Sequence, residues 1–270
     1  MPWSTIGFIG GGRVVRIILS AWHREKMALN KVLVSDCSAP VLKQLKQKFS
    51  EIDVTDDNRV SASQEVVFIA LHPPAIRTVL PQLAGALNPG AIVVSLAPVI
   101  TFNELSNLLG GFKHLVRMIP SAPAMLGRGY NPVAYAPAIT DDQRHQLKDL
   151  FAPLGEHPEV KEDTLEAYAI LTGMGPTYFW FQWQSLRELG RSFGLACEDV
   201  DRALKAMIAG AAQLLFDSGL DPKEVMDTIP VKPLAEIEPQ VNSLFQEKLS
   251  ALYQKLRTAS CEHLTKGVKQ

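Results

Sequence analysis

Three consecutive glycines, Gly10–Gly12, constrain this chain more than any other feature of its sequence. A short apolar run, Thr5–Ile9, precedes them, and a stretch of helical character, Val14–Trp22, follows them. A strand, a glycine turn and a helix in this order are typical of a βαβ unit that binds a dinucleotide, because glycine lets a pyrophosphate approach the backbone at a helix N-terminus. The pattern reads G-x-G-x-x-V, with Val15 where that fingerprint has a small residue. A glycine turn without a ligand is the alternative. The predicted contacts are Gly10, Gly11, Gly12, Arg13 and Val14.

Apolar runs and helical stretches alternate through the first 160 residues. After the first strand and helix, the predicted strands are Lys31–Ser35, Val66–Leu71 and Ala91–Ser95, and the predicted helices are Ala39–Phe49, Ala75–Leu87 and Phe102–Leu109. Continuous apolar strands separated by helices indicate a parallel sheet that is covered on both faces. We therefore predict that residues 1–160 form an α/β domain with a Rossmann-type, doubly wound parallel sheet.

The strand pattern disappears beyond residue 160. Three long segments of helical period follow, Leu165–Phe193, Cys197–Ser218 and Ala235–Leu264. Residues 161–270 are therefore predicted to form an all-α domain. Apolar and aromatic residues crowd the first of these segments more than one helical layer can hide, and two-fold pairing is the commonest way to cover such a surface. We expect a homodimer built from the C-terminal helices.

The composition excludes several classes of protein. The 27 Lys and Arg residues nearly balance the 28 Asp and Glu residues, so no global basic field draws the chain to nucleic acid. No segment approaches the roughly 18 uninterrupted apolar residues that a membrane span needs. Cys37, Cys197 and Cys261 are far apart, which opposes both a disulfide framework and a zinc site. We expect a cytoplasmic protein with a small-molecule substrate and no metal.

An acidic residue, Asp36, ends the second predicted strand, 24 residues after Gly12. A carboxylate at this point accepts hydrogen bonds from the ribose hydroxyls of NAD and repels the 2′-phosphate of NADP. A solvated acid or a helix cap is the alternative. The cofactor is therefore predicted to be NAD(H) or NADP(H), and Asp36 favours NAD.

Five segments resemble pyrroline-5-carboxylate reductase. They are Gly7–Gly12, Val66–Pro73, Val94–Ala97, Val116–Ala124 and Leu171–Tyr178. The fourth segment is similar to the family's V-R-x-M-P-N-T-P-A, and the fifth is close to its S-G-S-G-P-A-Y. All five occur in the family's order and spacing. The resemblance implies a Rossmann domain with a helical dimerisation domain, and reduction of a cyclic imine with NAD(P)H, as in proline biosynthesis.

The resemblance also assigns site residues by position. The nicotinamide end of the cofactor would lie against Leu71, His72, Pro73, Ser95 and Ala97, and Asn58 would match an asparagine near the adenosine. The matched segments further suggest substrate contacts at Pro120, Ser121, Gly173 and Gly175. Helix packing at a dimer seam is the alternative for the two glycines.

Several departures from the family concern the substrate more than the cofactor. The family has lysine at the position of His72, glycine at that of Val99, and Asn-Thr at Ser121-Ala122. Its S-P-G-G-T-T loop, which holds the substrate carboxylate, is missing, and the equivalent stretch runs from Asp227 to Ala235 without paired glycines or threonines. Lys232 in this stretch could attract a carboxylate, or it is simply a solvated lysine.

Reduction of an imine requires a proton donor besides the hydride of the cofactor. The candidates are His72, Thr172, Thr177 and Tyr178. His72 has the best physical case, because its loop leaves the carboxyl end of a central strand, where doubly wound sheets bind ligands. A loop histidine bonded to the backbone is the alternative.

Two further functions remain open. The chain can be an NAD(P)-dependent oxidoreductase that acts on another imine or on a carbonyl compound. It can also be a nucleotide-binding or regulatory protein that lost catalysis together with the substrate loop. Hydride transfer from NADH or NADPH to a small imine distinguishes the second of these from the enzymes.

Overall fold

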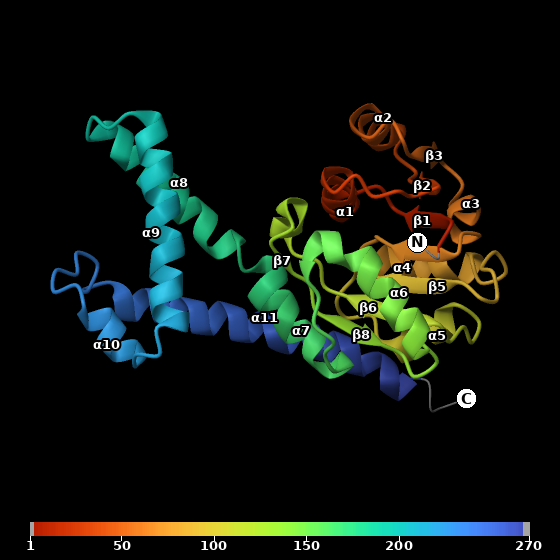
Figure 1. Cartoon of the computed structure of the whole chain (residues 1–270). Coiled ribbons are helices and arrows are strands. Elements are labelled where there is room, and N and C mark those ends of the chain that lie inside the picture. Colours follow the sequence, from red (N-terminus) through yellow and green to blue (C-terminus); the bar gives the residue numbers. More distant parts are fainter. Residues whose placement is uncertain (1–2, 267–270) are drawn as a thin grey trace. The chain divides into compact units, whose positions relative to one another are not determined.

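The computed structural model describes residues 3–266, and the side chains up to residue 259. The chain divides into two compact units. Of the described residues, the first unit comprises 3–174 and 252–266, and the second comprises Gly175–Ala251 (Figure 1). Residues 161–174, which we expected to open the helical domain, lie in the first unit. The side chain of Cys261 lies outside the described residues.

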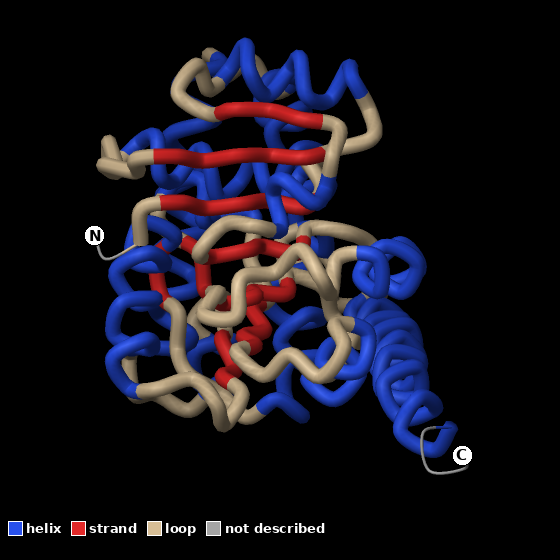
Figure 2. Tube along the Cα trace, turned by 90° about the vertical axis from the view of Figure 1, so that its right-hand side faces the viewer, coloured by secondary structure: helices blue, strands red, loops and turns tan. Residues whose placement is uncertain are grey.

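A seven-stranded sheet forms the centre of the first unit, with the order β3-β2-β1-β4-β5-β6-β8 (Figure 2). Its strands are β1 (Thr5–Ile9), β2 (Lys31–Ser35), β3 (Asp53–Thr55), β4 (Val66–Ile69), β5 (Ile92–Ser95), β6 (Leu115–Met118) and β8 (Val133–Tyr135). All neighbours are parallel except β6 and β8, which are antiparallel. The predicted doubly wound parallel sheet is thus confirmed, with one antiparallel strand added at its edge. A small second sheet pairs β7 (Gly129–Tyr130) with β9 (Gly155–Glu156).

Helices cover both faces of this sheet. They are α1 (Arg13–Arg24), α2 (Ala39–Lys48), α3 (Asn58–Ala62), α4 (Pro73–Val79), α5 (Phe102–Leu108) and α6 (Asp141–Phe151). Alternate strand residues point to opposite faces. Phe8 and Phe68 therefore belong to one core cluster, which α1 and α6 cover, while Ile9 and Ile69 belong to another, which α4 and α5 cover. The rings of Phe8 and Phe68 stack with centroids 4.7 Å apart.

The helix α1 is anchored at its C-terminal end. The indole Nε1 of Trp22 donates to the carbonyl of Leu150 at 3.0 Å. The guanidinium of Arg24 donates to the carbonyls of Met125 and Pro153 at 2.8 and 2.7 Å. These bonds tie the far end of the helix to three other segments of the first unit.

The predicted helix over Ala75–Leu87 is wrong at both ends. The helix α4 begins at Pro73 and ends at Val79, and one 3₁₀ turn, Leu80–Gln82, follows it. Pro81 explains the early end, because proline lacks an N–H and its ring collides with the carbonyl four residues earlier in a helix. The elements β3, β6, β8, α3 and α6 lie outside the predicted runs.

Helices predominate in the described residues beyond 160, as predicted. They are α7 (Leu165–Tyr168), a π-helical segment (Ala169–Met174), α8 (Thr177–Ser192), α9 (Cys197–Asp217), α10 (Pro222–Asp227) and α11 (Glu238–Lys266). The predicted helix over Leu165–Phe193 is interrupted at Gly175–Pro176, and proline at the helix entrance explains the new start at Thr177.

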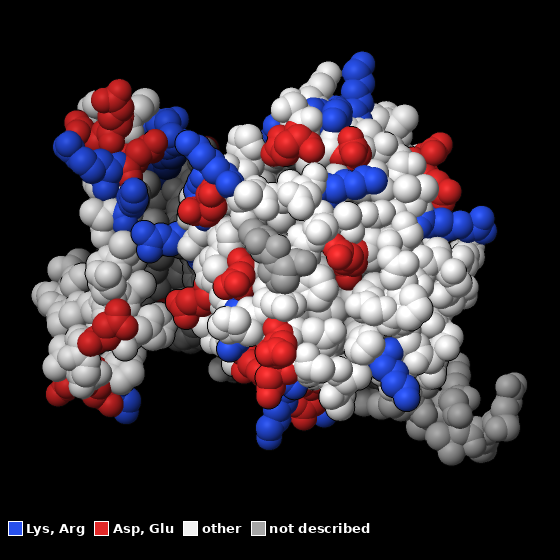
Figure 3. All heavy atoms as spheres, turned by 45° about the vertical axis from the view of Figure 1, so that its right-hand side comes forward, with Lys and Arg blue, Asp and Glu red and all other residues white. Residues whose placement is uncertain are grey.

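Within the second unit, the ring of Phe179 stacks on that of Trp183, with centroids 6.0 Å apart, and also contacts Phe245. Arg187 of α8 pairs with Asp201 of α9 at 2.5 Å. Within residues 3–266, no helix combines the length and the apolar character that crossing a bilayer requires. Cationic and anionic side chains are interspersed on the face that Figure 3 shows.

Candidate functional site

The glycine turn after β1 has a backbone that requires glycine. Gly10 has a φ of 95°, and a Cβ there would lie 2.6 Å from the carbonyl oxygen of Ala70. A Cβ on Gly11 would lie 2.9 Å from the side chain of Leu45 on α2. Both positions are therefore closed to any larger residue without rearrangement. The turn packs closely between β4 and α2.

Gly12 differs from these two glycines, because it faces open space. It is the N-cap of α1, and no other part of the chain within residues 3–266 lies within 4 Å of a Cβ placed on it. No side chain of the described residues caps the first turn of the helix, so its N–H groups are available to a ligand. A hollow of about 270 Å³ adjoins this turn, and the side chains of Arg13, Arg16 and Lys48 line it. Backbone donors, the positive end of a helix and three cations fit the phosphates of a dinucleotide.

Asp36 and Asn58 lie beside this turn. One carboxylate oxygen of Asp36 accepts from the N–H of Gly11, and the other accepts from the N–H of Ser38, both at 2.8 Å. Each oxygen keeps a lone pair for a further donor such as a ribose hydroxyl. The amide oxygen of Asn58 accepts from the hydroxyl of Ser35 at 2.8 Å. The carbonyl of Ser35 in turn accepts from the N–H of Gly10 at 2.7 Å, so both predicted residues lie near the turn. The bond of Asp36 to Gly11 was not foreseen.

The segment after β4 begins at the same edge of the sheet. Gly10 is close to it, since a Cβ on Gly10 would lie 3.0 Å from the side chain of Leu71. His72 is the N-cap of α4, with an exposed ring, and Pro73 is the first residue of that helix. The strand order reverses between β1 and β4, and open α/β sheets bind ligands at such a reversal.

The loop after β5 continues this edge. Ser95 and Ala97 are both buried, and among the described residues the hydroxyl of Ser95 has no hydrogen-bond partner. Val99 has a φ of 78°, in the left-handed region that β-branched residues avoid. Such a backbone costs about 1–3 kcal/mol and persists where the surroundings hold it.

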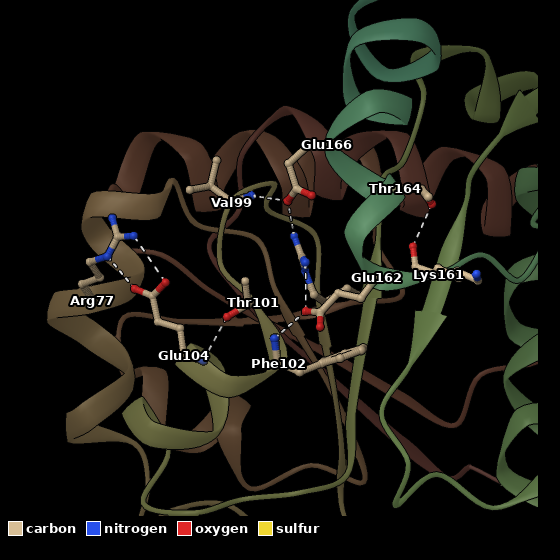
Figure 4. Close-up of polar contacts among 10 residues, drawn as sticks. Arg77, Val99, Thr101, Phe102, Glu104, Lys161, Glu162, Thr164 and Glu166 are labelled. Carbon is tan, nitrogen blue, oxygen red and sulfur yellow. Dashed lines mark hydrogen bonds and ion pairs between the residues drawn. The ribbon is translucent and has the colours of Figure 1, made fainter. Parts of the chain in front are cut away.

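A buried ion-pair network holds this loop (Figure 4). Glu166 accepts from the N–H of Val99 at 3.0 Å, and Glu162 accepts from the N–H of Phe102 at 2.6 Å. The guanidinium of Arg117 donates to Glu162 at 3.0 Å and to Glu166 at 2.8 Å. None of these residues was a predicted site residue. An arginine inside the apolar strand Leu115–Met118 was the available signal, because a buried cation requires acidic partners.

The predicted substrate contacts of the first unit lie close together. A Cβ on Gly173 would lie 3.2 Å from the side chain of Ile119 and 3.9 Å from the carbonyl of Pro120. Ser121 is buried, and its hydroxyl accepts from the N–H of Tyr130 at 3.1 Å. Thr172 donates to the carbonyl of Tyr168 at 2.9 Å within the π-helical segment. Irregular helical turns of this kind are frequent at functional sites.

Two tyrosines border this region. The rings of Tyr130 and Tyr168 have centroids 6.0 Å apart. Partial burial and the neighbouring Tyr168 raise the pKa of Tyr130, so its phenol stays protonated at neutral pH. Neither tyrosine was a predicted site residue.

The remaining predicted residues belong to the second unit. Thr177 opens α8 and is exposed, and Gly175 is buried just before it. Lys232 lies 3.8 Å from Asp227 and lines a hollow of about 730 Å³ together with Lys223 and Ile229. The predicted lysine therefore has an acidic partner within its own unit.

Comparisons with known proteins agree with this architecture. The family model described as NADP oxidoreductase, coenzyme F420-dependent, matches residues 5–98. A pyrroline-5-carboxylate reductase of Pseudomonas aeruginosa is 26% identical, and the match covers 100% of this chain and 99% of that protein.

Solved structures are similar over nearly the whole chain. The pyrroline-5-carboxylate reductase of Coxiella burnetii has a TM-score of 0.74 at 24% identity, covering 96% of this chain and 99% of that one. The pyrroline carboxylate reductase of Plasmodium falciparum, solved with NADP bound, has a TM-score of 0.79 at 18% identity, covering 96% and 98%. The resemblance read from the sequence is confirmed, since the chain is similar to pyrroline-5-carboxylate reductases over nearly its whole length.

Proposed function

We propose that the protein is an NAD(P)H-dependent oxidoreductase that transfers hydride to a small imine. The observation that carries this proposal is the open N-terminus of α1 at Gly12, next to Asp36 and at the point where the strand order reverses. This arrangement fits the pyrophosphate and ribose of a dinucleotide. The name of the Pseudomonas aeruginosa relative supports the reaction class.

The chain's own residues position the reactants. The glycine turn at Gly12 would hold the phosphates of the dinucleotide, and Leu71 with the Ser95–Ala97 segment would hold the nicotinamide, which would supply the hydride. His72 is exposed at the carboxyl edge of the sheet, and imidazole is a common proton donor near neutral pH. We propose His72 as the donor to the imine nitrogen. Thr172, Thr177 and Tyr178 are the other candidates.

The substrate differs from that of the family in this proposal. Pro230 and Pro233 have no N–H to offer in the stretch that replaces the family's loop, and Lys232 is paired with Asp227. A small imine or carbonyl compound with less negative charge fits these residues better than an amino-acid-like substrate. A turnover screen of cyclic imines and small oxo acids with NADH and NADPH tests the function. Absence of hydride transfer to every compound would contradict it.

We propose that the enzyme prefers NADH to NADPH. The carboxylate of Asp36 is bound to the N–H of Gly11 in the glycine turn, and it would repel the 2′-phosphate of NADP. We expect NADH to bind at least about tenfold more tightly, which corresponds to about 1.4 kcal/mol. Calorimetric dissociation constants for both cofactors measure this difference. Asp36→Ser should reduce it, whereas a tenfold preference of the wild type for NADPH would refute the role of Asp36.

We further propose that the protein is a homodimer. Large apolar side chains remain exposed on α8 and α9: Trp180 at 48%, Phe181 at 65%, Leu189 at 49%, Met207 at 49% and Phe216 at 79%. Large exposed apolar surfaces are uncommon on monomers, and a two-fold interface is the commonest way to cover them. Sedimentation at micromolar concentration should show a dimer. A monomer at that concentration would contradict the proposal.

A further inference from the structure

The segment that runs from Ser95, the last residue of β5, through Ala97 to α5 contains an unfavourable backbone conformation. Val99 is buried and has a φ of 78°. Glycine adopts this conformation freely, but a β-branched residue does not. A loop with valine at this position therefore needs outside contacts to keep its shape.

Two glutamates supply these contacts at two points of the loop. Glu166 accepts from the N–H of Val99 at 3.0 Å, and Glu162 accepts from the N–H of Phe102 at 2.6 Å. Both carboxylates come from the short helical stretch that follows Lys161, and Figure 4 shows them reaching the loop from the same side. Charged acceptors form stronger hydrogen bonds to backbone N–H groups than neutral ones do.

One arginine holds both carboxylates. Arg117 is 1% exposed, and its two terminal nitrogens donate to the same oxygens of Glu162 and Glu166 that the loop amides use. Arg117 lies on β6 directly opposite Ser95 of β5 in the sheet register. The guanidinium thus fixes the two acceptors relative to the strand from which the loop leaves.

We propose that Glu166, held by Arg117, is a positioning residue for the nicotinamide half of the cofactor. It acts by keeping Val99 in its left-handed conformation, which places the Ser95–Ala97 backbone against the nicotinamide. This inference rests on the proposed function. Without the acceptor, Val99 relaxes toward negative φ and the loop moves, whereas glycine at position 99 has no such tendency.

Ligands with and without the nicotinamide test this inference. We compare NADH and NADPH with ADP-ribose and 2′-phospho-ADP-ribose, which bind the glycine turn alone, by calorimetry. Glu166→Ala should weaken the binding of NADH and NADPH by about tenfold or more, equal to about 1.4 kcal/mol. It should leave the affinity for the two nicotinamide-free ligands unchanged. Val99→Gly alone should change little. Val99→Gly in the Glu166→Ala background should restore dinucleotide binding to within about threefold of the wild type, since the two changes act on one backbone conformation.

Glu104→Ala is the matched control. Glu104 pairs with Arg77 at 2.6 Å and is also a poorly exposed glutamate of this region, but its carboxylate does not bind the loop amides (Figure 4). This variant should bind all four ligands like the wild type. If Glu166→Ala is not folded, Glu166→Gln decides, because it keeps the shape and removes the charge. We then expect a selective loss of dinucleotide affinity of about threefold or more.

The outcomes separate this inference from the proposed function. Three results would overturn the positioning role: an equal loss of affinity for all four ligands in the deciding variant, unchanged affinity for the dinucleotides, or failure of Val99→Gly to restore dinucleotide binding. In each case, binding of the ligands by the wild type would still support the proposed function. If the wild type binds none of the four ligands, both the proposed function and this inference fail.

Discussion

Replacing Gly12 by valine should abolish dinucleotide binding without unfolding the protein. Gly12 has a φ of −71°, which valine adopts, and among the described residues no other part of the chain lies within 4 Å of a Cβ placed there. The fold therefore has no need of glycine at this position. Binding of a phosphate at the helix N-terminus does require glycine here, because a branched side chain would fill the space that the phosphate oxygens need. We expect Gly12→Val to weaken the binding of NADH by about a hundredfold or more, equal to about 2.7 kcal/mol, as measured by calorimetry.

Gly85→Val provides the control for this experiment. Gly85 also faces open space, but it lies in the turn that follows the 3₁₀ segment Leu80–Gln82, away from the glycine turn. The substitution is chemically identical, and it should leave both the affinity for NADH and the melting temperature close to the wild type. An unchanged affinity in Gly12→Val would show that the pyrophosphate does not bind at this turn.

Turnover of pyrroline-5-carboxylate should be weak or absent. The family's Gly-Gly-Thr-Thr loop is missing, and loss of a preorganised donor can cost about 3 kcal/mol, or a hundredfold in rate. Pro230 and Pro233 remove two backbone donors from the equivalent stretch, and the ammonium of Lys232 already lies 3.8 Å from Asp227. We therefore expect kcat/KM below the usual enzyme range of about 10⁴–10⁸ M⁻¹s⁻¹.

Steady-state assays with either cofactor measure this activity, and the Pseudomonas aeruginosa relative, assayed in parallel, is the positive control. This protein should reduce an uncharged cyclic imine faster than pyrroline-5-carboxylate, because the residues proposed to bind the cofactor are present. A kcat/KM within the usual range for pyrroline-5-carboxylate would show that the missing loop is not essential here.

The sequence predicted best where one physical signal dominated. β1, β2, β4 and β5 are continuous apolar runs, and the structure has strands at all four. β6 was missed as a strand because Arg117 interrupts its apolar pattern, and the acids that neutralise it lie 45 and 49 residues away. α6 was missed because its exposed face is polar and only Leu147, Leu150 and Phe151 are buried.

The candidate site divides in the same way. The glycine turn and Asp36 follow from spacing that is local to one βαβ unit. The left-handed backbone of Val99 does not follow from any local spacing, since nothing in the residues around a valine predicts a positive φ. Only the family's glycine at that position pointed to it. The π-helical turn at Ala169–Met174 likewise has no local signature, because its apolar pattern is that of an ordinary helix.

The anchoring of α1 has a consequence for the entropy of binding. Trp22 and Arg24 fasten the C-terminal end of this helix, so the N–H groups at its other end have fixed positions before a phosphate is present. Ordering a free backbone costs about 1–2 kcal/mol per residue. Here this entropy is lost when the protein folds, so cofactor binding does not have to order the backbone again. Affinity at the glycine turn therefore depends partly on hydrogen bonds at the opposite end of the helix, far from any ligand atom.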